Sequence, residues 1–452
     1  MSADEIARGP DRSTGPRTGA WTVERGKTDG VMPGLRILDS SGVRYFIKFD
    51  SPGYRELATG AEVVVTKLFY ALGYHVPENY VAYVNRENLV IGEGVRKHYD
   101  DGRRRPLGPK GLDLVLSRAA REPDGSYQVL ASKALDGEPV GGFRFHGTRP
   151  DDPNDVIPHE ARRELRGLRV FSAWVNHADN KGSNTLDTSI TGAAGHVLRH
   201  HLFDFGSTLG SAGIMAREAW EGAEFIFDER DALARMFRFG LPTRPWMRAN
   251  DPELNAVGHF EAATFEPESW KPRLPNPVFS RTRPEDLFWA ARRVAAFSDE
   301  QIQAAVKGGR YSDPRTADYL VETLIRRRDK IAEAWLNLVN PVIDVTLDTG
   351  GVLTFHNAAV RAGVSTNPQG YRVTWSTFDN STGATTTLGT GRADPTLRRP
   401  TLSGLPTRVG DFIRVDLSAI EPPRAEWADP MRTYFRRTGN GWKLVGLERT
   451  AL

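Results

Sequence analysis

Residues 176–184 read NHADNKGSN, and residues 202–206 read LFDFG. The first segment carries the pattern H-x-D-x-K-x-x-N, and the second ends in the triplet DFG after an apolar pair. Because each residue type has a usage of about one in twenty, four fixed positions recur by chance on the order of 0.003 times in a chain of 452 residues. These two segments, in this order, therefore decide how the fold is interpreted.

The polar residues of the two segments are those that phosphoryl transfer requires. A transferring phosphoryl group carries much charge and needs positioning and cations more than covalent help. Asp179 is predicted to orient an acceptor hydroxyl and take its proton, and Lys181 to contact the γ-phosphate. Asn184 and Asp204 are predicted to hold Mg²⁺, which prefers one or two such oxygens together with phosphate oxygens.

A lysine and a glutamate upstream complete the expected charge set. Lys48 lies between apolar residues of a predicted strand, 45–49, so its side chain points to the opposite face from its neighbours. Glu62 lies in the middle of a helix predicted over about 55–72 from its apolar spacing. We expect Lys48 to contact the α- and β-phosphates and Glu62 to hold Lys48. Glu56, at the start of the helix, is the rival partner.

A glycine-containing loop, residues 26–34, precedes the first predicted strand of this region. Gly30 and Gly34 have no side chain, so backbone N–H groups at these positions can approach phosphate oxygens closely. The loop is therefore predicted to cover the phosphates of a nucleotide.

The order of these motifs resembles the protein-kinase-like superfamily, and the N-terminal part is similar to its atypical HipA-type and CotH-type kinases. Residues 30–33, GVMP, resemble the G-V-Q-P phosphate loop of HipA-type kinases. The helix that carries Glu62 runs into residues 71–77, ALGYHVP, which resemble the A-L-G-x-x-V-P ending of their glutamate helix. The resemblance spans about residues 26–210.

The resemblance also assigns a role to the first residue of the catalytic stretch, and the residue after it departs from the family pattern. In the family the histidine braces the catalytic loop, so His177 is predicted to be a packed structural residue rather than a base. Ala178 stands where an arginine normally couples this loop to a phosphorylated activation loop. Control by that route is therefore not expected.

Apolar spacing predicts three further helices, over 158–175, 284–297 and 316–339. Ser298 and Gln301 have the spacing of a capping box, which predicts another helix start after residue 298.

The resemblance implies an α+β, two-lobed protein-kinase-like fold, and the change to period-2 runs after residue 340 adds a C-terminal all-β domain. The predicted organisation is a disordered leader over 1–20, an N-lobe over 21–136, a mostly helical C-lobe over 137–340 and a β-domain over 341–452. The strand that ends near Ala131 and the segment Ser132–Leu135 that follows it are the predicted adenine-contacting hinge.

The leading functional hypothesis is a Mg²⁺-dependent kinase that transfers the γ-phosphate of ATP to a hydroxyl acceptor of a protein or small molecule. The resemblance leaves two alternatives. The first is a pseudokinase that binds nucleotide, or nothing, and acts as a scaffold. The second is a kinase-like enzyme that transfers AMP.

Composition excludes several other classes. The chain has no cysteine, which excludes disulfides, thiolate metal sites and a cysteine nucleophile. The formal net charge of +3 is small for the length and gives no support to nucleic-acid binding. No apolar run is long enough to span a membrane, and no apolar signal segment is visible near the start. A cytoplasmic location is therefore expected, and a secreted or periplasmic location is the alternative if a signal segment has been removed.

Overall fold

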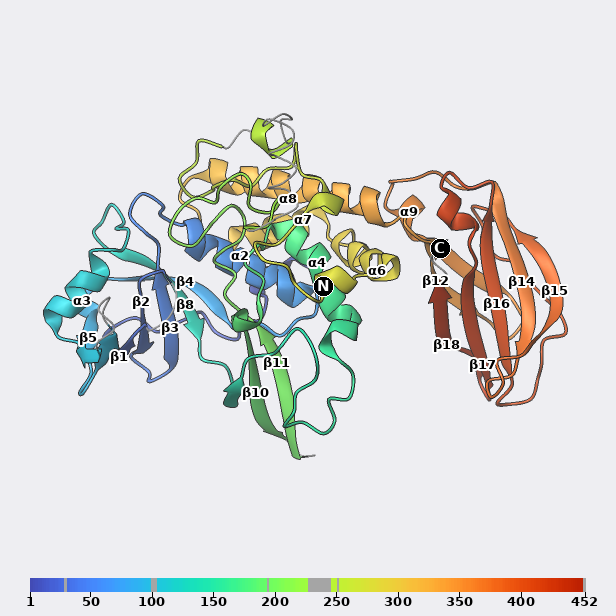
Figure 1. The fold of residues 1–452 in the computed structure, drawn as a ribbon, viewed down its shortest axis with the longest axis horizontal. Coiled ribbons are helices and arrows are strands. Elements are labelled where there is room, and N and C mark those ends of the chain that lie inside the picture. Colours follow the sequence, from blue (N-terminus) through green and yellow to red (C-terminus); the bar gives the residue numbers. More distant parts are fainter. Residues whose placement is uncertain (28–30, 99–103, 193–194, 227–244, 250–251, 450–452) are drawn as a thin grey trace, which may run out of the picture. The chain divides into compact units, whose positions relative to one another are not determined.

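Helices and strands alternate along the chain up to α8, and strands predominate after it (Figure 1). The computed structural model describes residues 1–27, 31–98, 104–192, 195–226, 245–249 and 252–449. They divide into two compact units. The first unit is Met1–Arg281 with Phe297–Arg327, and the second is Thr282–Ala296 with Arg328–Leu452. The predicted α+β class is confirmed.

A six-stranded sheet forms the N-terminal part of the first unit, with the strand order β4-β8-β3-β2-β1-β5. All neighbours are antiparallel except β1 and β5. Side chains alternate along β3: Tyr45, Ile47 and Phe49 are buried on one face, and Lys48 lies on the other. The strands are β1 (Trp21–Gly26), β2 (Gly34–Leu38), β3 (Arg44–Phe49), β4 (Asn79–Val84), β5 (Leu89–Ile91) and β8 (Tyr127–Lys133).

Shorter elements complete this part of the chain. The helix α2 (Leu57–Ala71) follows β3 and is almost entirely buried, and Figure 1 shows it beside the sheet. The apolar spacing predicted this helix within two residues at its start and one at its end. The remaining elements are β6 (Arg96–His98), β7 (Arg104–Pro106) and α3 (Pro109–Leu116).

The rest of the first unit combines helices with a three-stranded sheet. The helices α4 (Arg163–Val175), α7 (Asp299–Lys307) and α8 (Pro314–Trp335) match three predicted segments, and the capping box at Ser298 is present. The helix α8 continues across the boundary into the second unit. The three-stranded sheet consists of β9 (Glu138–Gly141), β10 (Thr185–Gly192) and β11 (Gly195–Leu202).

Residues 1–20 differ from the predicted disordered leader. They contain the helix α1 (Ala3–Arg8), which begins with a capping box and buries Ile6. The ammonium group of Lys67, on α2, donates to the carbonyl of Arg8 at 3.1 Å and to Asp11 at 2.9 Å. A helix of six residues is too short to show periodicity, and the contacts that order the segment come from residues far along the chain.

The second unit joins α6 (Pro284–Val294) to the C-terminal strands. Its main sheet has the order β15-β14-β16-β17-β18, in which β17 and β18 form an antiparallel hairpin. The second segment of this unit starts at Arg328, whereas the sequence predicted a domain boundary at residue 341. The other elements are β12 (Val342–Leu347), β13 (Leu353–Asn357), α9 (Ala358–Arg361), β14 (Gly370–Phe378), β15 (Thr385–Ala393), β16 (Phe412–Ile420), β17 (Met431–Thr438) and β18 (Gly441–Arg449).

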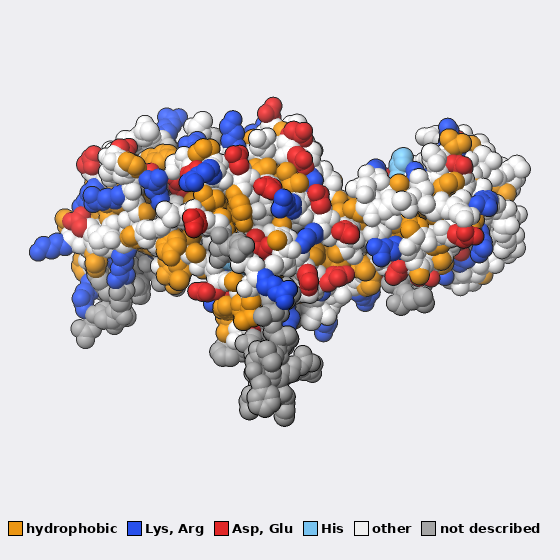
Figure 2. Space-filling view, turned by 90° about the horizontal axis from the view of Figure 1, so that it is seen from above, with side chains coloured by type: hydrophobic (Ala, Val, Ile, Leu, Met, Phe, Trp, Pro, Cys, Tyr) orange, Lys and Arg blue, Asp and Glu red, His pale blue; other side chains and the backbone are white. Residues whose placement is uncertain are grey.

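Figure 2 shows the charged side chains on one face of the molecule. Figure 2 shows basic and acidic side chains interspersed on the face in view, as expected from the small net charge. None of the helices in the described part of the chain combines the length and the apolar composition needed to cross a bilayer.

Candidate functional site

Lys48 lies at the centre of the candidate site. Its Nζ atom donates to Oε2 of Glu62 at 2.9 Å, to Oε1 of Glu62 at 3.2 Å and to Oδ1 of Asp204 at 2.7 Å. The three residues come from β3, from α2 and from the segment after β11. The structure therefore brings together three predicted site residues that are separated by up to 156 positions in the sequence.

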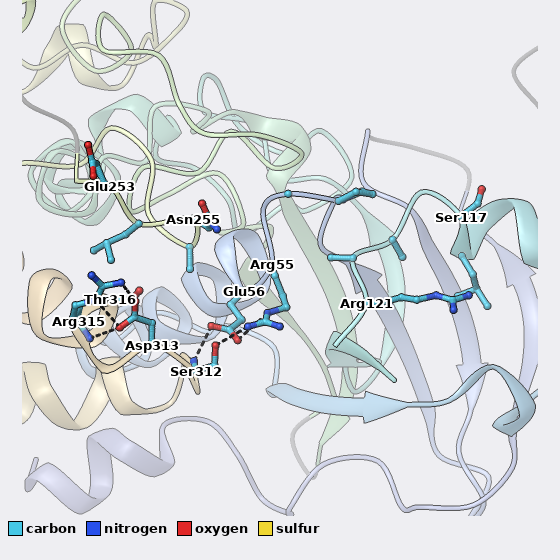
Figure 3. A pocket seen from close by; sticks show the side chains of 17 residues that line it. Arg55, Glu56, Ser117, Arg121, Glu253, Asn255, Ser312, Asp313, Arg315 and Thr316 are labelled. Carbon is cyan, nitrogen blue, oxygen red and sulfur yellow. Dashed lines mark hydrogen bonds and ion pairs between the residues drawn. The ribbon is translucent and has the colours of Figure 1, made fainter. Parts of the chain in front are cut away.

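The rival carboxylate lies elsewhere. Glu56 accepts a hydrogen bond from the backbone N–H of Ser312 at 2.8 Å. Figure 3 shows Glu56 with Arg55 and Ser312 in the lining of a cavity of about 760 Å³, which contains none of the predicted site residues. The lysine therefore pairs with Glu62, in the middle of the helix, and not with Glu56.

Asp50 positions the helix that carries Glu62, and the sequence analysis missed it. Its two carboxylate oxygens accept from the backbone N–H groups of Glu56, Ala58 and Thr59 at 2.9–3.1 Å and from the hydroxyl of Thr59 at 2.5 Å. A carboxylate at a helix N-terminus satisfies N–H groups that have no partner within the helix. Asp50, which lies two residues after Lys48, therefore fixes the start of α2 at Leu57. Burial raises the pKa of Asp50 to about 6, although these hydrogen bonds oppose the shift.

The β10–β11 hairpin brings Asn184 and Asp204 together. Thr185 pairs with Leu202 at the open end of the hairpin, and the N–H of Phe203 donates to the carbonyl of Asn184 at 3.1 Å. Both predicted metal ligands thus lie just outside the open end of the hairpin. Asn184 directly precedes β10, and Asp204 is the second residue after β11. Asp204 has a φ of +65°, in the left-handed region that few non-glycine residues adopt and that is enriched at functional sites.

Phe205 and Gly206 connect this segment to α2. The ring of Phe205 packs on Phe69 of α2 at 4.8 Å between centroids and on His177 at 5.7 Å. A Cβ atom at Gly206 would lie 3.1 Å from Oε2 of Glu62. Glycine is therefore the residue that lets the chain pass this close to the Lys48–Glu62 pair.

The loop after α4 places Asp179 and Lys181 side by side. The helix ends at Asn176, which has a φ of +51°. Lys181 Nζ donates to both carboxylate oxygens of Asp179, at 2.9 and 3.0 Å. Nδ2 of Asn184 donates to the carbonyl of Asp179 at 3.0 Å, which ties the predicted base to the predicted metal ligand.

The charge states follow from these contacts. Burial raises the pKa of the Asp204 carboxyl, but the ammonium group of Lys48 outweighs it, so this pKa lies below its ordinary value and Asp204 is ionised. Burial lowers the pKa of His177 to about 4, so its ring is neutral at pH 7. A buried, neutral histidine packed against Phe205 matches the structural role predicted for it.

The glycine loop is described in part. Gly30 lies outside the described residues. Gly34 pairs with Lys48 at the start of β2, where a Cβ atom would lie 2.6 Å from the carbonyl oxygen of Ile47. Close approach of β2 to β3 is thus a structural reason for this glycine. Lys27, which the sequence analysis did not single out, adds to the lowering of the Asp204 pKa, so its charge acts on the same site.

The predicted hinge lies at the end of β8. The strand continues to Lys133, beyond the predicted end near Ala131, and Ala134 donates its N–H to the carbonyl of Arg44 at 3.0 Å. Contact between Ser132–Leu135 and an adenine ring stays a prediction.

The donor set fits a magnesium ion held together with phosphates. Oδ1 of Asp204 accepts from Lys48 and Nδ2 of Asn184 donates to the loop, which leaves Oδ2 of Asp204 and Oδ1 of Asn184 for a cation. Within the described ranges no group of three or more histidine and acidic side chains is placed so that it could hold a metal ion. Magnesium bound to nucleotide uses one or two protein oxygens and does not require such a cluster.

Comparisons with known proteins give structural similarity alone. No protein-family model and no curated protein matches the chain. The structure is similar to that of the Helicobacter pylori proinflammatory kinase CtkA, with 12% identity over 70% of this chain and 95% of that one and a TM-score of 0.35. It is also similar to the Golgi casein kinase with Mn and ADP bound, with 9% identity over 74% of this chain and 78% of that one and a TM-score of 0.32. A second structure of the Golgi casein kinase has 9% identity over 72% of this chain and 76% of that one, with a TM-score of 0.27. Because these TM-scores are low, the functional argument rests on the chain's own residues.

Proposed function

We propose that the first unit is a Mg²⁺-dependent kinase that transfers the γ-phosphate of ATP to a hydroxyl acceptor. The observation that carries this proposal is the position of Lys48 between Glu62 and Asp204. Hydrogen bonds from both sides, one to a buried glutamate and one to a partly exposed aspartate, fix the direction of the ammonium group. It can therefore contact the α- and β-phosphates while Asp204 and Asn184 hold the metal ion.

Each step has a residue of the chain. Asp179 accepts the proton of the acceptor hydroxyl as the oxygen attacks the γ-phosphorus. The bond from this phosphorus to the bridging oxygen breaks, and ADP leaves with that oxygen. Lys181 lies against Asp179 in the structure and supplies a positive charge beside the transferring group. Magnesium, when bound, neutralises charge that develops on the phosphate oxygens.

The test uses γ-labelled ATP with Mg²⁺ and the full-length chain. We expect label on the protein, or turnover of ATP, in the wild type. The Asp179→Ala and Asp204→Ala variants should lose it. Asp318→Ala is the matched control, because Asp318 is an exposed aspartate of α8 with no part in the site.

Three outcomes would contradict the proposal. Label from α-labelled ATP on the protein would show AMP transfer instead. Equal turnover in Asp179→Ala would remove the assigned base. A thermal shift with Mg²⁺ and ATP that disappears in Asp204→Ala, without any turnover in the presence of varied hydroxyl acceptors, would favour the scaffold.

A further inference from the structure

A cavity of about 360 Å³ lies within the second unit, between α6 and the end of α9. Its charged lining consists of three arginines: Arg292 and Arg293 from α6 and Arg361 from α9. A pocket of this volume, mostly apolar with a few polar groups, has the dimensions of a small-ligand site. The uncharged lining consists of Trp289, Ala295, Ala296, Leu336, Ala358 and Ala362.

One carboxylate holds two of these arginines. Oδ1 of Asp344 accepts from Nη2 of Arg292 at 3.4 Å, and Oδ2 accepts from Nη1 of Arg361 at 3.0 Å. Asp344 has a φ of +53° and lies where the pairing of β12 with β13 is interrupted by a bulge. Bulges redirect side chains and recur beside functional sites. The irregular backbone thus lets one aspartate fix guanidinium groups from two separate elements beside the cavity.

The positive charge of the arginines that line the cavity exceeds the negative charge of Asp344. The third guanidinium, of Arg293, lies over the ring of Trp289 with its Cζ atom 4.6 Å from the centroid. Asp344 pairs with two of the three arginines that line the cavity, so these four side chains together carry two positive charges in excess. Burial lowers the pKa of Arg292, and repulsion by Arg361 and Arg293 lowers it further against the attraction of Asp344. An anion in the cavity would relieve this repulsion.

We propose that this cavity binds a phosphate monoester carried on a peptide side chain. Such a group carries a charge of about −1.5 to −2 at pH 7, which matches the excess, whereas a carboxylate carries one charge. Arginine presents its N–H donors in a fork that suits phosphate oxygens. The ring of Trp289 and the alanine side chains give the carbon part of the phosphorylated residue an apolar surface. The site lies in the second unit and does not depend on the kinase proposal for the first.

The experiment titrates the full-length chain into a fluorescein-labelled peptide that carries one phosphotyrosine and follows anisotropy. We expect binding of this peptide and not of its unphosphorylated form. The Arg293→Ala/Arg361→Ala double variant should weaken binding at least about tenfold, because it removes two charged hydrogen-bond donors. Arg408→Ala is the matched control and should bind as the wild type does, since Arg408 is an exposed arginine of the same unit that pairs with Asp411.

Two further arms keep the inference open to refutation if the double variant does not fold. Arg361→Lys keeps the charge and loses the fork, so it should weaken binding by a smaller factor than the double variant. Asp204→Ala should leave peptide binding unchanged. Equal affinity of the unphosphorylated peptide, wild-type affinity in the double variant, or loss of binding in Asp204→Ala would overturn the proposal. If inorganic phosphate displaced the peptide with an affinity equal to that of the peptide, the occupant would be free phosphate, and this result would also overturn the proposal.

Discussion

Replacing Lys48 by methionine removes the ammonium group and keeps a side chain of similar length. Glu62 is then a carboxylate with 3% of its side chain exposed and without its cation. Removing one partner of a buried ion pair costs about 3–5 kcal/mol. Asp204 is 44% exposed and keeps much of its hydration, so its lost contact adds little. We therefore expect Lys48→Met to lower the free energy of unfolding by about 3 kcal/mol at pH 8.

This loss should depend on pH with a defined sign. Burial already raises the pKa of Glu62, and without Lys48 the attraction that opposes this shift is gone. A carboxyl group whose pKa is higher in the folded chain than in the unfolded chain contributes stability at low pH, and this stability is lost as the pH rises through the folded pKa. The penalty of Lys48→Met should therefore be smaller at pH 5, where Glu62 is protonated to a greater extent, than at pH 8.

The assay is urea unfolding of the wild type and of each variant at pH 5 and pH 8, followed by tryptophan fluorescence. The Lys48→Met/Glu62→Gln double variant has no charge at either position of the pair and should recover most of the stability at pH 8. Lys133→Met is the matched control, because Lys133 pairs with Glu78 at 2.8 Å in a more exposed place and should cost no more than about 1 kcal/mol. Equal losses at both pH values, or no recovery in the double variant, would refute the reasoning.

The remaining predictions concern the neighbours of this pair. Asp50→Ala removes the cap of α2 and should destabilise the chain by about 1–2 kcal/mol, seen as a lower Tm, and weaken ATP binding. Gly206→Ala places a methyl group 3.1 Å from Glu62 and should lower kcat while leaving circular dichroism unchanged. Asp179→Asn should lower kcat by about 10²–10⁴-fold with the Kd for ATP unchanged. Because the pKa of His177 is about 4, its ring should not titrate between pH 6 and 9 in an NMR experiment, and a step in that range would contradict its burial.

The sequence predicted the residues of the candidate site better than the contacts that support them. Lys48, Glu62, Asn184 and Asp204 stand out because each is a polar residue in a conspicuous pattern. Asp50 does not, because the N–H groups it accepts lie six to nine residues along the chain. They reach Asp50 through a backbone reversal that no local capping signal describes.

The helices show a similar limit. Apolar spacing located α6 and α8 because it reports that one face is buried. It does not report against what, so the membership of α6 in the same unit as the C-terminal strands could not be predicted. Gly34 is a third case: a glycine needed for strand contact and a glycine needed for phosphate contact look the same in a sequence.

The chain passes between the two compact units three times, after Arg281, Ala296 and Arg327. During synthesis, α6 therefore leaves the ribosome before any of the strands in its own unit have been made. The helix α7, which belongs to the first unit, is synthesised only after α6. Domains that are continuous in sequence can fold one after the other as they emerge. Here neither unit can be completed in that way. The C-terminal strands therefore do not form a compact unit by themselves, because that unit also includes α6, which comes earlier in the sequence.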